Sequence, residues 1–425
     1  MNAIPFGLLP DNSSIAPDGS LSIGGVPLLE LADEFGTPLF VYDEQHLRDR
    51  CREAVAAFGD GVAYASKAFL CLAMARLAHE EGMWIDVASG GELHVVQRAG
   101  VPASRCVLHG NNKSLAELRT ALAAGIGKVV VDSFDELDRL DRLASEGLPA
   151  PDVLIRVTPG VEAHTHEFVR TGQEDSKFGF GWHSGAAAEA VARARGSRSV
   201  DLVGLHVHIG SQVFVADNFA SAIETIAPLA REHGLAEFCI GGGLGVAYVE
   251  GEEAPTIAQW ARAVRGACER AGVPGHVTAE PGRSIVAAAA VTLYEVGTVK
   301  DIPGIRTYVS VDGGMSDNPR PVLYGSGYET FLPREVAADR PRRVRLVGKH
   351  CESGDLLVRE AQVPADLVVG DILATPVTGA YGHTMASNYN KVTRPAVVFV
   401  ADGSARLVVR RETFDDLTRL DVPVA

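Results

Sequence analysis

Lys67 is the residue whose type and position suggest chemistry most directly. It follows the apolar, strand-like run Val62–Ser66 and precedes a stretch with helical spacing. An amine that loses solvent at such a strand end favours its neutral form, which is the form that makes Schiff bases. The alternative is a surface lysine whose stem lies on apolar neighbours while its ammonium stays in water. Other strand ends must decide between the two.

A run of glycines, Gly241-Gly242-Gly243-Leu244-Gly245, follows a later strand-like segment. Backbone without side chains can close on a phosphate and offer its N–H groups. The run does not fit the dinucleotide-binding pattern GxGxxG, because Tyr248 stands at the third glycine position, and no GxxxxGK[ST] occurs. A glycine-rich turn without a ligand remains the alternative.

Glu280 follows the last of these strand-like runs, in Glu280-Pro281-Gly282-Arg283. A carboxylate at such a position can hold the N–H of a pyridinium ring, which keeps a cofactor ring able to accept electrons. It could equally pair with Arg283.

Two histidine-rich segments raise the question of a metal. His206 and His208 share one face of a strand, and residues 162–167 contain two histidines and two glutamates. Neither segment has the HExxH spacing or a set of cysteine partners, so we expect no metal. The better use of His208 is an imidazole that lies flat on an aromatic cofactor.

The elements that must position these residues alternate between strand and helix. Eight β-rich runs are separated mostly by Ala/Leu/Glu/Arg-rich stretches with helical spacing. This number and length predict an α/β fold, a (β/α)8 TIM barrel, whose chemistry sits at the C-terminal ends of its strands. A doubly wound open sheet is the alternative. The predicted strands are Val62–Ser66, Trp84–Ala88, Cys106–His109, Val129–Asp132, Val153–Val157, Leu202–His208, Glu237–Ile240 and His276–Ala279.

The pattern changes after residue 285, where β-rich segments alternate with Gly/Pro/Asp turns. This predicts a second, mostly antiparallel, all-β domain. The barrel is expected to span residues 37–285 and to begin near Pro38-Leu39-Phe40-Val41. Residues 1–36 and 286–425 are expected to form the β-rich domain.

Composition narrows the possible partners. The chain has 425 residues and a net charge of -15, with no Lys/Arg-rich run, so nucleic acid and anionic membranes are poor partners. No signal peptide or membrane-spanning stretch is evident. The six cysteines are scattered without a CxxC pair. We therefore expect reduced thiols and a cytoplasmic protein.

In this order, the motifs resemble those of the alanine-racemase-like (type III) pyridoxal-phosphate decarboxylases, and within that family the members that act on meso-2,6-diaminoheptanedioate (diaminopimelate). The resemblance runs from Phe35-Gly36-Thr37-Pro38 to Arg410-Arg411-Glu412-Thr413. A mild departure is Thr384, where many relatives carry serine. The landmarks are Tyr64–Ala68, Ser89–Leu93, His109–Ser114, His208–Gln212, Gly241–Gly243, Glu280–Arg283, Cys351–Asp355 and Gly379–Tyr381.

The resemblance implies a role for several residues of these motifs. Lys67 would form the Schiff base with pyridoxal 5'-phosphate, His208 would stack on the ring, and Glu280 would bind the pyridine nitrogen. Cys351 would donate a proton, so the implied catalytic residues are Lys67, His208 and Cys351. The implied cofactor-binding residues are Lys67, Asp86, His208, Ser211, Gly241, Gly242, Gly243, Glu280, Gly282, Arg283 and Tyr381. The implied substrate-binding residues are Arg283, Arg320, Tyr324, Glu352 and Tyr381.

The implied reaction removes the carboxylate at the D-centre of diaminopimelate and gives L-lysine and CO2, the last step of lysine biosynthesis. Arg320 offers a fork for the distal carboxylate, and Glu352 offers an opposite charge for the distal ammonium. A substrate without a distal carboxylate would leave the arginine unpaired. The resemblance also implies a β-sandwich-like barrel as second domain and a homodimer with shared active sites, in which the Cys351 segment comes from the partner.

Three other functions are compatible with this fold. One is an ornithine or arginine decarboxylase, which would act on amino acids without a distal carboxylate. Another is a relative that acts on a different carboxylate-bearing substrate. The third is a non-catalytic binding protein, against which the retention of Lys67, Glu280 and Cys351 argues.

Overall fold

The computed structural model describes residues 3–160, 175–214 and 216–422. The histidine-rich segment 162–167 lies outside these residues. The chain divides into two compact units. The barrel unit comprises Arg50–Val246 and Ala254–Ser284, and the β-rich unit comprises Met1–Asp49, Ala247–Glu253 and Ile285–Ala425.

The barrel unit contains eight parallel strands in the spatial order β13-β12-β11-β9-β8-β7-β6-β5. The first and last strands meet, since the N–H of Ala63 donates to Ala279 O at 3.0 Å and that of Ala65 to Pro281 O at 3.1 Å. The prediction of a (β/α)8 barrel is confirmed, and the open doubly wound sheet is wrong. The strands are β5 (Ala63–Ala65), β6 (Trp84–Val87), β7 (Cys106–Leu108), β8 (Lys128–Val131), β9 (Asp152–Thr158), β11 (Asp201–Val207), β12 (Glu237–Cys239) and β13 (His276–Thr278), with β10 (Phe180–Gly181) paired to β9.

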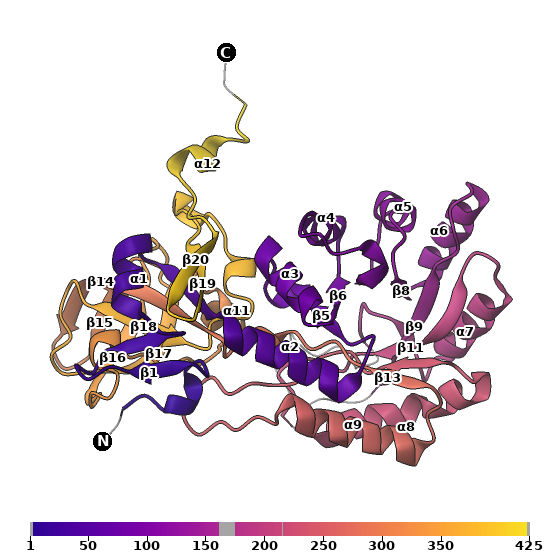
Figure 1. Ribbon diagram of the computed structural model, residues 1–425, viewed down its shortest axis with the longest axis horizontal. Helices are drawn as coiled ribbons and strands as arrows, with labels where there is room; N and C mark the ends of the chain where they lie inside the picture. The colour runs from indigo at the N-terminus through magenta and orange to yellow at the C-terminus, as the bar shows by residue number, and fades with distance from the viewer. Residues whose placement is uncertain (1–2, 161–174, 215, 423–425) are drawn as a thin grey trace. The chain divides into compact units, whose positions relative to one another are not determined.

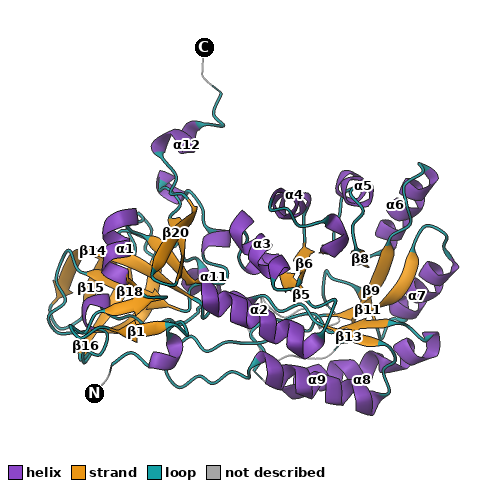
Figure 2. Ribbon diagram, viewed as in Figure 1, coloured by secondary structure: helices purple, strands orange, loops and turns teal. Residues whose placement is uncertain are grey.

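Helices alternate with these strands and lie outside them (Figures 1 and 2). Several begin at a side chain that caps the first turn: Ser114 and Thr256 each form a reciprocal capping box. The barrel interior is filled by small and branched side chains from alternating positions, including Ala63, Val107 and Leu154. The helices are α2 (Glu44–Phe58), α3 (Leu72–Glu80), α4 (Gly90–Arg98), α5 (Leu115–Ala123), α6 (Phe134–Ser145), α7 (Ala186–Gly196), α8 (Ala216–His233), α9 (Ile257–Ala271) and α10 (Arg283–Val286).

The β-rich unit is built on a sheet of order β17-β16-β15-β14-β4-β19-β20, with β18 also paired to β14 and a separate sheet β1-β2-β3. Helices α1 (Leu28–Phe35), α11 (Arg320–Tyr324) and α12 (Phe414–Thr418) join these strands. The strands are β1 (Ser13–Ile15), β2 (Leu21–Ile23), β3 (Val26–Pro27), β4 (Leu39–Asp43), β14 (Ala290–Ile302), β15 (Arg306–Val311), β16 (Arg342–Val347), β17 (Leu356–Val363), β18 (Ile372–Pro376), β19 (Ala396–Ala401) and β20 (Ser404–Val409).

Two segments lie elsewhere than the sequence predicted. Strand β4 was expected to begin the barrel, but it pairs antiparallel with β14 and parallel with β19 in the β-rich unit. The segment Ala247–Glu253 also belongs to the β-rich unit, although barrel residues precede and follow it. Both differences depend on contacts between distant parts of the chain. Strand β4 pairs with β14 and β19, and Tyr248 packs against Tyr328, and neither contact can be read from a local sequence pattern. Among the described residues, no helix is long and apolar enough to cross a membrane.

A buried ion pair fixes the loop after β7. Lys113 Nζ lies 2.7 Å from Glu136 Oε1, and both side chains are only 2% exposed. The same ammonium donates to the carbonyls of Gly110 and Val130, each at 2.7 Å. Glu136 Oε2 accepts from the N–H of Asp132 at 3.0 Å. The pair thus ties the end of β7 to the end of β8.

Replacing Glu136 by alanine is expected to lower the free energy of unfolding by about 3–5 kcal/mol, because Lys113 is left as an uncompensated buried charge. The midpoint of thermal unfolding, followed by circular dichroism, measures this loss. The matched control is Glu146→Ala, which removes a partner of the partly exposed Arg119 and should shift the midpoint little. Equal midpoints for the two variants would contradict the prediction.

Candidate active site

Lys67 lies in a short 3-10 turn, Ser66–Ala68, directly after β5. The residue is exposed, so the loss of solvent expected from the sequence is not present in this structure. The charge of Lys67 nevertheless acts on a buried carboxyl group. Burial raises the pKa of Asp86, and the positive charges of His109 and Lys67 lower it. Lys67 therefore stands at the C-terminal end of the barrel, within electrostatic reach of Asp86 on β6.

Glu280 follows β13 and is held by two imidazoles. His109 Nε2 lies 2.8 Å from Glu280 Oε1, and His206 Nε2 lies 2.9 Å from Oε2. All three side chains are buried. The possibility that Glu280 pairs with Arg283 is not realised, since the Arg283 guanidinium donates to Ser211 Oγ at 2.9 Å.

The charges in this cluster are unequal. Although burial disfavours a carboxylate, His109 and His206 hold the pKa of Glu280 well below its ordinary value. Burial lowers the pKa of His206 to about 4. Burial also opposes charge on His109, but the Asp86 and Glu280 carboxylates raise its pKa. The surroundings therefore favour the ionised form of Glu280, the neutral form of His206 and the charged form of His109.

His208 follows β11, and its ring is fixed by a backbone amide. The N–H of Gly242 donates to His208 Nδ1 at 3.1 Å, which leaves Nε2 to carry the proton of a neutral ring. Burial, together with the charges of Lys67 and Arg156, lowers the pKa of His208 well below its ordinary value. A neutral imidazole of fixed orientation suits the stacking role that the family resemblance implies.

The triple glycine is required by close backbone contacts. A Cβ on Gly242 would lie 2.3 Å from the carbonyl oxygen of Glu280, and one on Gly243 would lie 2.3 Å from that of Gly210. Gly241 and Gly243 also have positive φ, of 65° and 109°. Because these glycines have no side chains, the chain after β12 can pack directly against the backbone that follows β11 and β13.

The barrel unit fits pyridoxal phosphate by its set of donors and acceptors. A buried carboxylate kept ionised suits a pyridine nitrogen, and a neutral imidazole suits the ring face. The bare glycine turn, with the Ser211 hydroxyl and the Arg283 guanidinium beside it in the fold, suits a phosphate. Gly282 packs so closely on Ala65 that a Cβ there would lie 2.9 Å from the alanine Cβ, which brings this segment to the end of β5.

No role for His109 or His206 followed from the sequence. Both lie at or near the ends of predicted strands, and His206 was expected to share one strand face with His208. Side chains two residues apart in a strand point to the same side, so His206 shares the face of His208. Nothing in the local pattern marked either histidine as a partner of Glu280.

In the β-rich unit, Arg320 lies at the start of α11 and is only 4% exposed. Its guanidinium carbon lies 4.2 Å from the ring centre of Tyr248 and 5.6 Å from that of Tyr328. Arg320 Nη1 donates to Tyr328 Oη at 2.5 Å, whereas Nε has no hydrogen-bond partner among the described residues. Two aromatic rings thus hold a buried guanidinium that keeps a donor available.

Cys351 lies on a loop whose backbone is fixed. It alone of the six cysteines, all of which are described, is exposed. Asn390 Oδ1 accepts from the N–H of Cys351 at 3.2 Å and lies 3.2 Å from His350 Nδ1. The Asp355 carboxylate accepts from the N–H of His350 at 2.8 Å. The loop therefore presents a thiol to solvent from a rigid support.

The other predicted substrate residues come from the same unit. Glu352 is exposed and follows Cys351 on its loop, and Tyr324 ends α11 half-buried. Tyr381 is half-buried with a positive φ of 58°. Before it, Gly379 packs so tightly that a Cβ would lie 1.9 Å from the carbonyl oxygen of Val286. The structure thus groups Arg320 with Tyr324 and Cys351 with Glu352.

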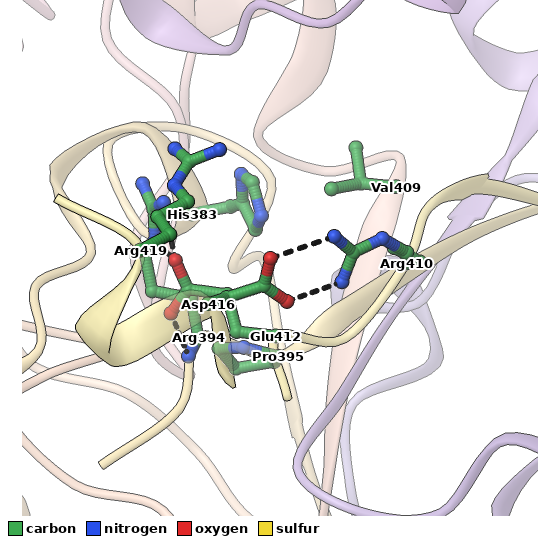
Figure 3. A pocket seen from close by; sticks show the side chains of 8 residues that line it. All are labelled: His383, Arg394, Pro395, Val409, Arg410, Glu412, Asp416 and Arg419. Atoms are coloured by element: carbon green, nitrogen blue, oxygen red, sulfur yellow. Dashed lines mark hydrogen bonds and ion pairs between the residues drawn. The ribbon is translucent and has the colours of Figure 1, made fainter. Parts of the chain in front are cut away.

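A charged cavity of about 230 Å³ lies near the end of the β-rich unit (Figure 3). Its charges are largely paired within its own wall: Arg394 with Glu412, at 2.8 Å, and Arg410 with Asp416, at 2.8 Å. Burial lowers the pKa of His383, which also lines it, to about 4. The cavity is therefore a set of satisfied ion pairs around a neutral imidazole.

Comparison with known proteins agrees with these features. The family described as "Pyridoxal-dependent decarboxylase, pyridoxal binding domain" matches residues 44–287. The chain is 50% identical to the diaminopimelate decarboxylase of Mycobacterium tuberculosis, with 97% of each chain covered. It is 46% identical to that of Bacillus subtilis, with 95% of this chain and 96% of the relative covered.

Solved structures of similar proteins have the same fold. The diaminopimelate decarboxylase of M. jannaschii, in complex with L-lysine, is 33% identical and superposes with a TM-score of 0.90 over 97% of this chain and 98% of the other. The Helicobacter pylori diaminopimelate decarboxylase, also complexed with L-lysine, is 32% identical, with a TM-score of 0.85 over 93% and 99%. The chain therefore belongs to the pyridoxal-dependent decarboxylase family and, within it, groups with the diaminopimelate decarboxylases.

Proposed function

We propose that this protein uses pyridoxal phosphate to decarboxylate diaminopimelate at its D-centre, giving L-lysine and CO2 in the last step of lysine biosynthesis. The observation that carries the proposal is the buried Glu280, held by His109 and His206 inside a barrel whose chain matches diaminopimelate decarboxylases over nearly its full length. The two similar structures that hold L-lysine, the product of this reaction, support the same substrate class.

The barrel unit supplies the cofactor-binding groups in this proposal. When bound, pyridoxal phosphate provides an electron sink for the bond that loses CO2. Lys67 Nζ attaches it covalently, Glu280 accepts the pyridine N–H, and His208 covers one face of the ring. Its phosphate is bound by Ser211, the glycine turn, the Gly282-Arg283 backbone and Tyr381. Asp86 completes the cofactor-binding set.

The β-rich unit supplies the groups that recognise substrate. Arg320 binds the distal carboxylate through its guanidinium, and Glu352 binds the distal ammonium. Tyr324, Tyr381 and Arg283 complete the substrate contacts. The buried Arg320, whose Nε keeps a donor available, supports a carboxylate-bearing substrate over ornithine or lysine, which would leave that charge unpaired.

Cys351 is the proton donor in this proposal, and it comes from a second copy of the chain. The α-carbon that loses CO2 must gain a proton, and a thiol can provide it as a general acid. The exposure of Cys351 on a rigid loop supports that role. The proposed assembly is a cytoplasmic homodimer with two shared active sites.

Replacing Lys67 by alanine is expected to abolish both the visible absorbance of the bound cofactor and nearly all turnover, because no other amine is proposed to attach it. Absorbance spectra and release of CO2 from diaminopimelate measure the two effects. The matched control, Lys300→Ala, removes an exposed lysine of β14 and should leave both unchanged. A Lys67→Ala protein that keeps both properties would refute the proposed role.

Replacing Glu352 by alanine is expected to lower kcat/KM for diaminopimelate, because a charged partner of the distal ammonium is lost. The loss of transition-state stabilisation is about 2–5 kcal/mol where bound substrate buries that contact. Cofactor absorbance should stay the same. Steady-state kinetics give the change, and Glu360→Ala, which alters an exposed carboxylate paired with Arg343, is the control. Unchanged kcat/KM would show that Glu352 has only a structural role.

Mixing Lys67→Ala and Cys351→Ala proteins is expected to restore activity if each active site takes these two residues from different chains. Each mutant homodimer is impaired, whereas a mixed dimer has one site with both lesions and one with neither. Random exchange of equal amounts makes about half the dimers mixed, so roughly a quarter of all sites should recover. Demonstrated subunit exchange without recovered activity would place both residues in one chain.

A further inference from the structure

We propose that His109 and His206 are positioning residues that hold Glu280 as a charged, oriented carboxylate and thereby keep the pyridine nitrogen of the cofactor protonated. This inference rests on the proposed role of Glu280 and assigns a function to two side chains to which neither the motifs nor the similar proteins give a role.

The geometry gives each carboxylate oxygen its own imidazole. His109, after β7, approaches Oε1 at 2.8 Å, and His206, on β11, approaches Oε2 at 2.9 Å. The two rings meet edge to face, with centroids 5.1 Å apart and planes at 67°. A carboxylate with a hydrogen bond to each oxygen cannot rotate without breaking one of them. Because each oxygen has a further lone pair, Glu280 can still accept an N–H from a ligand.

The two histidines contribute in different ways. His206 is 1% exposed, and its Nδ1 has no hydrogen-bond partner among the described residues. A neutral ring that carries its proton on Nε2 therefore suffices, because only Nε2 has an acceptor, Glu280 Oε2. His109 Nε2 also lies 3.8 Å from Asp86 Oδ1, and a positive charge there faces two carboxyl groups. His206 thus supplies a neutral donor, and His109 supplies a donor with charge.

This division has a consequence for the group that Glu280 binds. A buried carboxylate without donors takes up a proton, and a protonated carboxyl no longer stabilises a pyridinium. Two donors keep the proton on the ligand nitrogen instead. Arg156 is a further cation near the cluster, but its guanidinium pairs with Asp132 at 3.4 Å.

A metal ion is the competing explanation for three close ligand atoms. The ligand atoms of His109, His206 and Glu280 all lie within 4.8 Å of one another. Two nitrogen or oxygen ligands of a tetrahedral metal at about 2.0–2.1 Å are roughly 3.3 Å apart. The separations of 2.8 and 2.9 Å are shorter, as expected of hydrogen bonds. The arrangement is therefore a hydrogen-bonded cluster.

The experiment uses full-length enzyme reconstituted with pyridoxal phosphate labelled with 15N in the ring. The 15N chemical shift reports whether the pyridine nitrogen carries a proton, independently of turnover. His206→Leu and His109→Leu remove a donor, whereas His206→Gln can keep one through its amide. We expect the leucine variants to shift the signal towards the unprotonated form and to lower kcat about 10- to 100-fold, with His206→Gln close to wild type.

Unchanged 15N signals in leucine variants that fold and bind cofactor would overturn the inference, and the histidines would then be structural. If the leucine variants do not fold, His109→Gln decides, because it keeps a donor but loses the charge. Its 15N signal should lie nearer the unprotonated form than in wild type, because a carboxylate without the His109 charge competes better for the proton, and identical signals would overturn the inference. Glu280→Gln separates this result from the proposed function: an unshifted signal there would show that Glu280 itself does not bind the nitrogen.

Discussion

A carboxylate inside a protein keeps its charge only where other groups stabilise it, and much of the barrel unit is arranged around that requirement at Glu280. Donors arrive from the ends of β7 and β11, and closure of the sheet at Ala63 and Ala279 brings the first strand beside the residue that precedes Glu280. The bare backbone of Gly242 meets the Glu280 carbonyl. A Cβ added there would collide with that carbonyl oxygen, so the glycine turn and the end of β13 could not lie this close together.

The barrel could be predicted because its strands are buried on both faces and read as short apolar runs between helices. Each predicted run overlaps an observed strand, with ends that differ by at most one residue, for example Val62–Ser66 against Ala63–Ala65. Strand β4 shows that local patterns identify a strand but not the strands with which it pairs. Its apolar pattern identifies a buried strand, but its partners, β14 and β19, lie far along the chain.

The reactive residue types could be predicted from their positions at strand ends, but their surroundings could not. The apolar run before Lys67 suggested a desolvated amine, whereas the turn that carries it leaves it exposed. Sequence proximity suggested Arg283 as the partner of Glu280, whereas the barrel brings histidines from two other strands. Arg320 was expected to contact substrate because of the family resemblance, but its surroundings could not be predicted. The ring of Tyr248 beside it comes from Ala247–Glu253, a segment that interrupts the barrel sequence and belongs to the β-rich unit, as does Tyr328.

The placement of β4 between β14 and β19 has a consequence for the order in which the protein can form during synthesis. The barrel unit is almost continuous in sequence, so its strands can pair while the ribosome still translates the rest of the chain. The central sheet of the other unit needs a strand from near the start and one from near the end. Until Ala396–Ala401 has left the ribosome, β4 has an unpaired edge that invites association with other chains. The central sheet of the β-rich unit is therefore completed only by a strand that is translated long after the barrel.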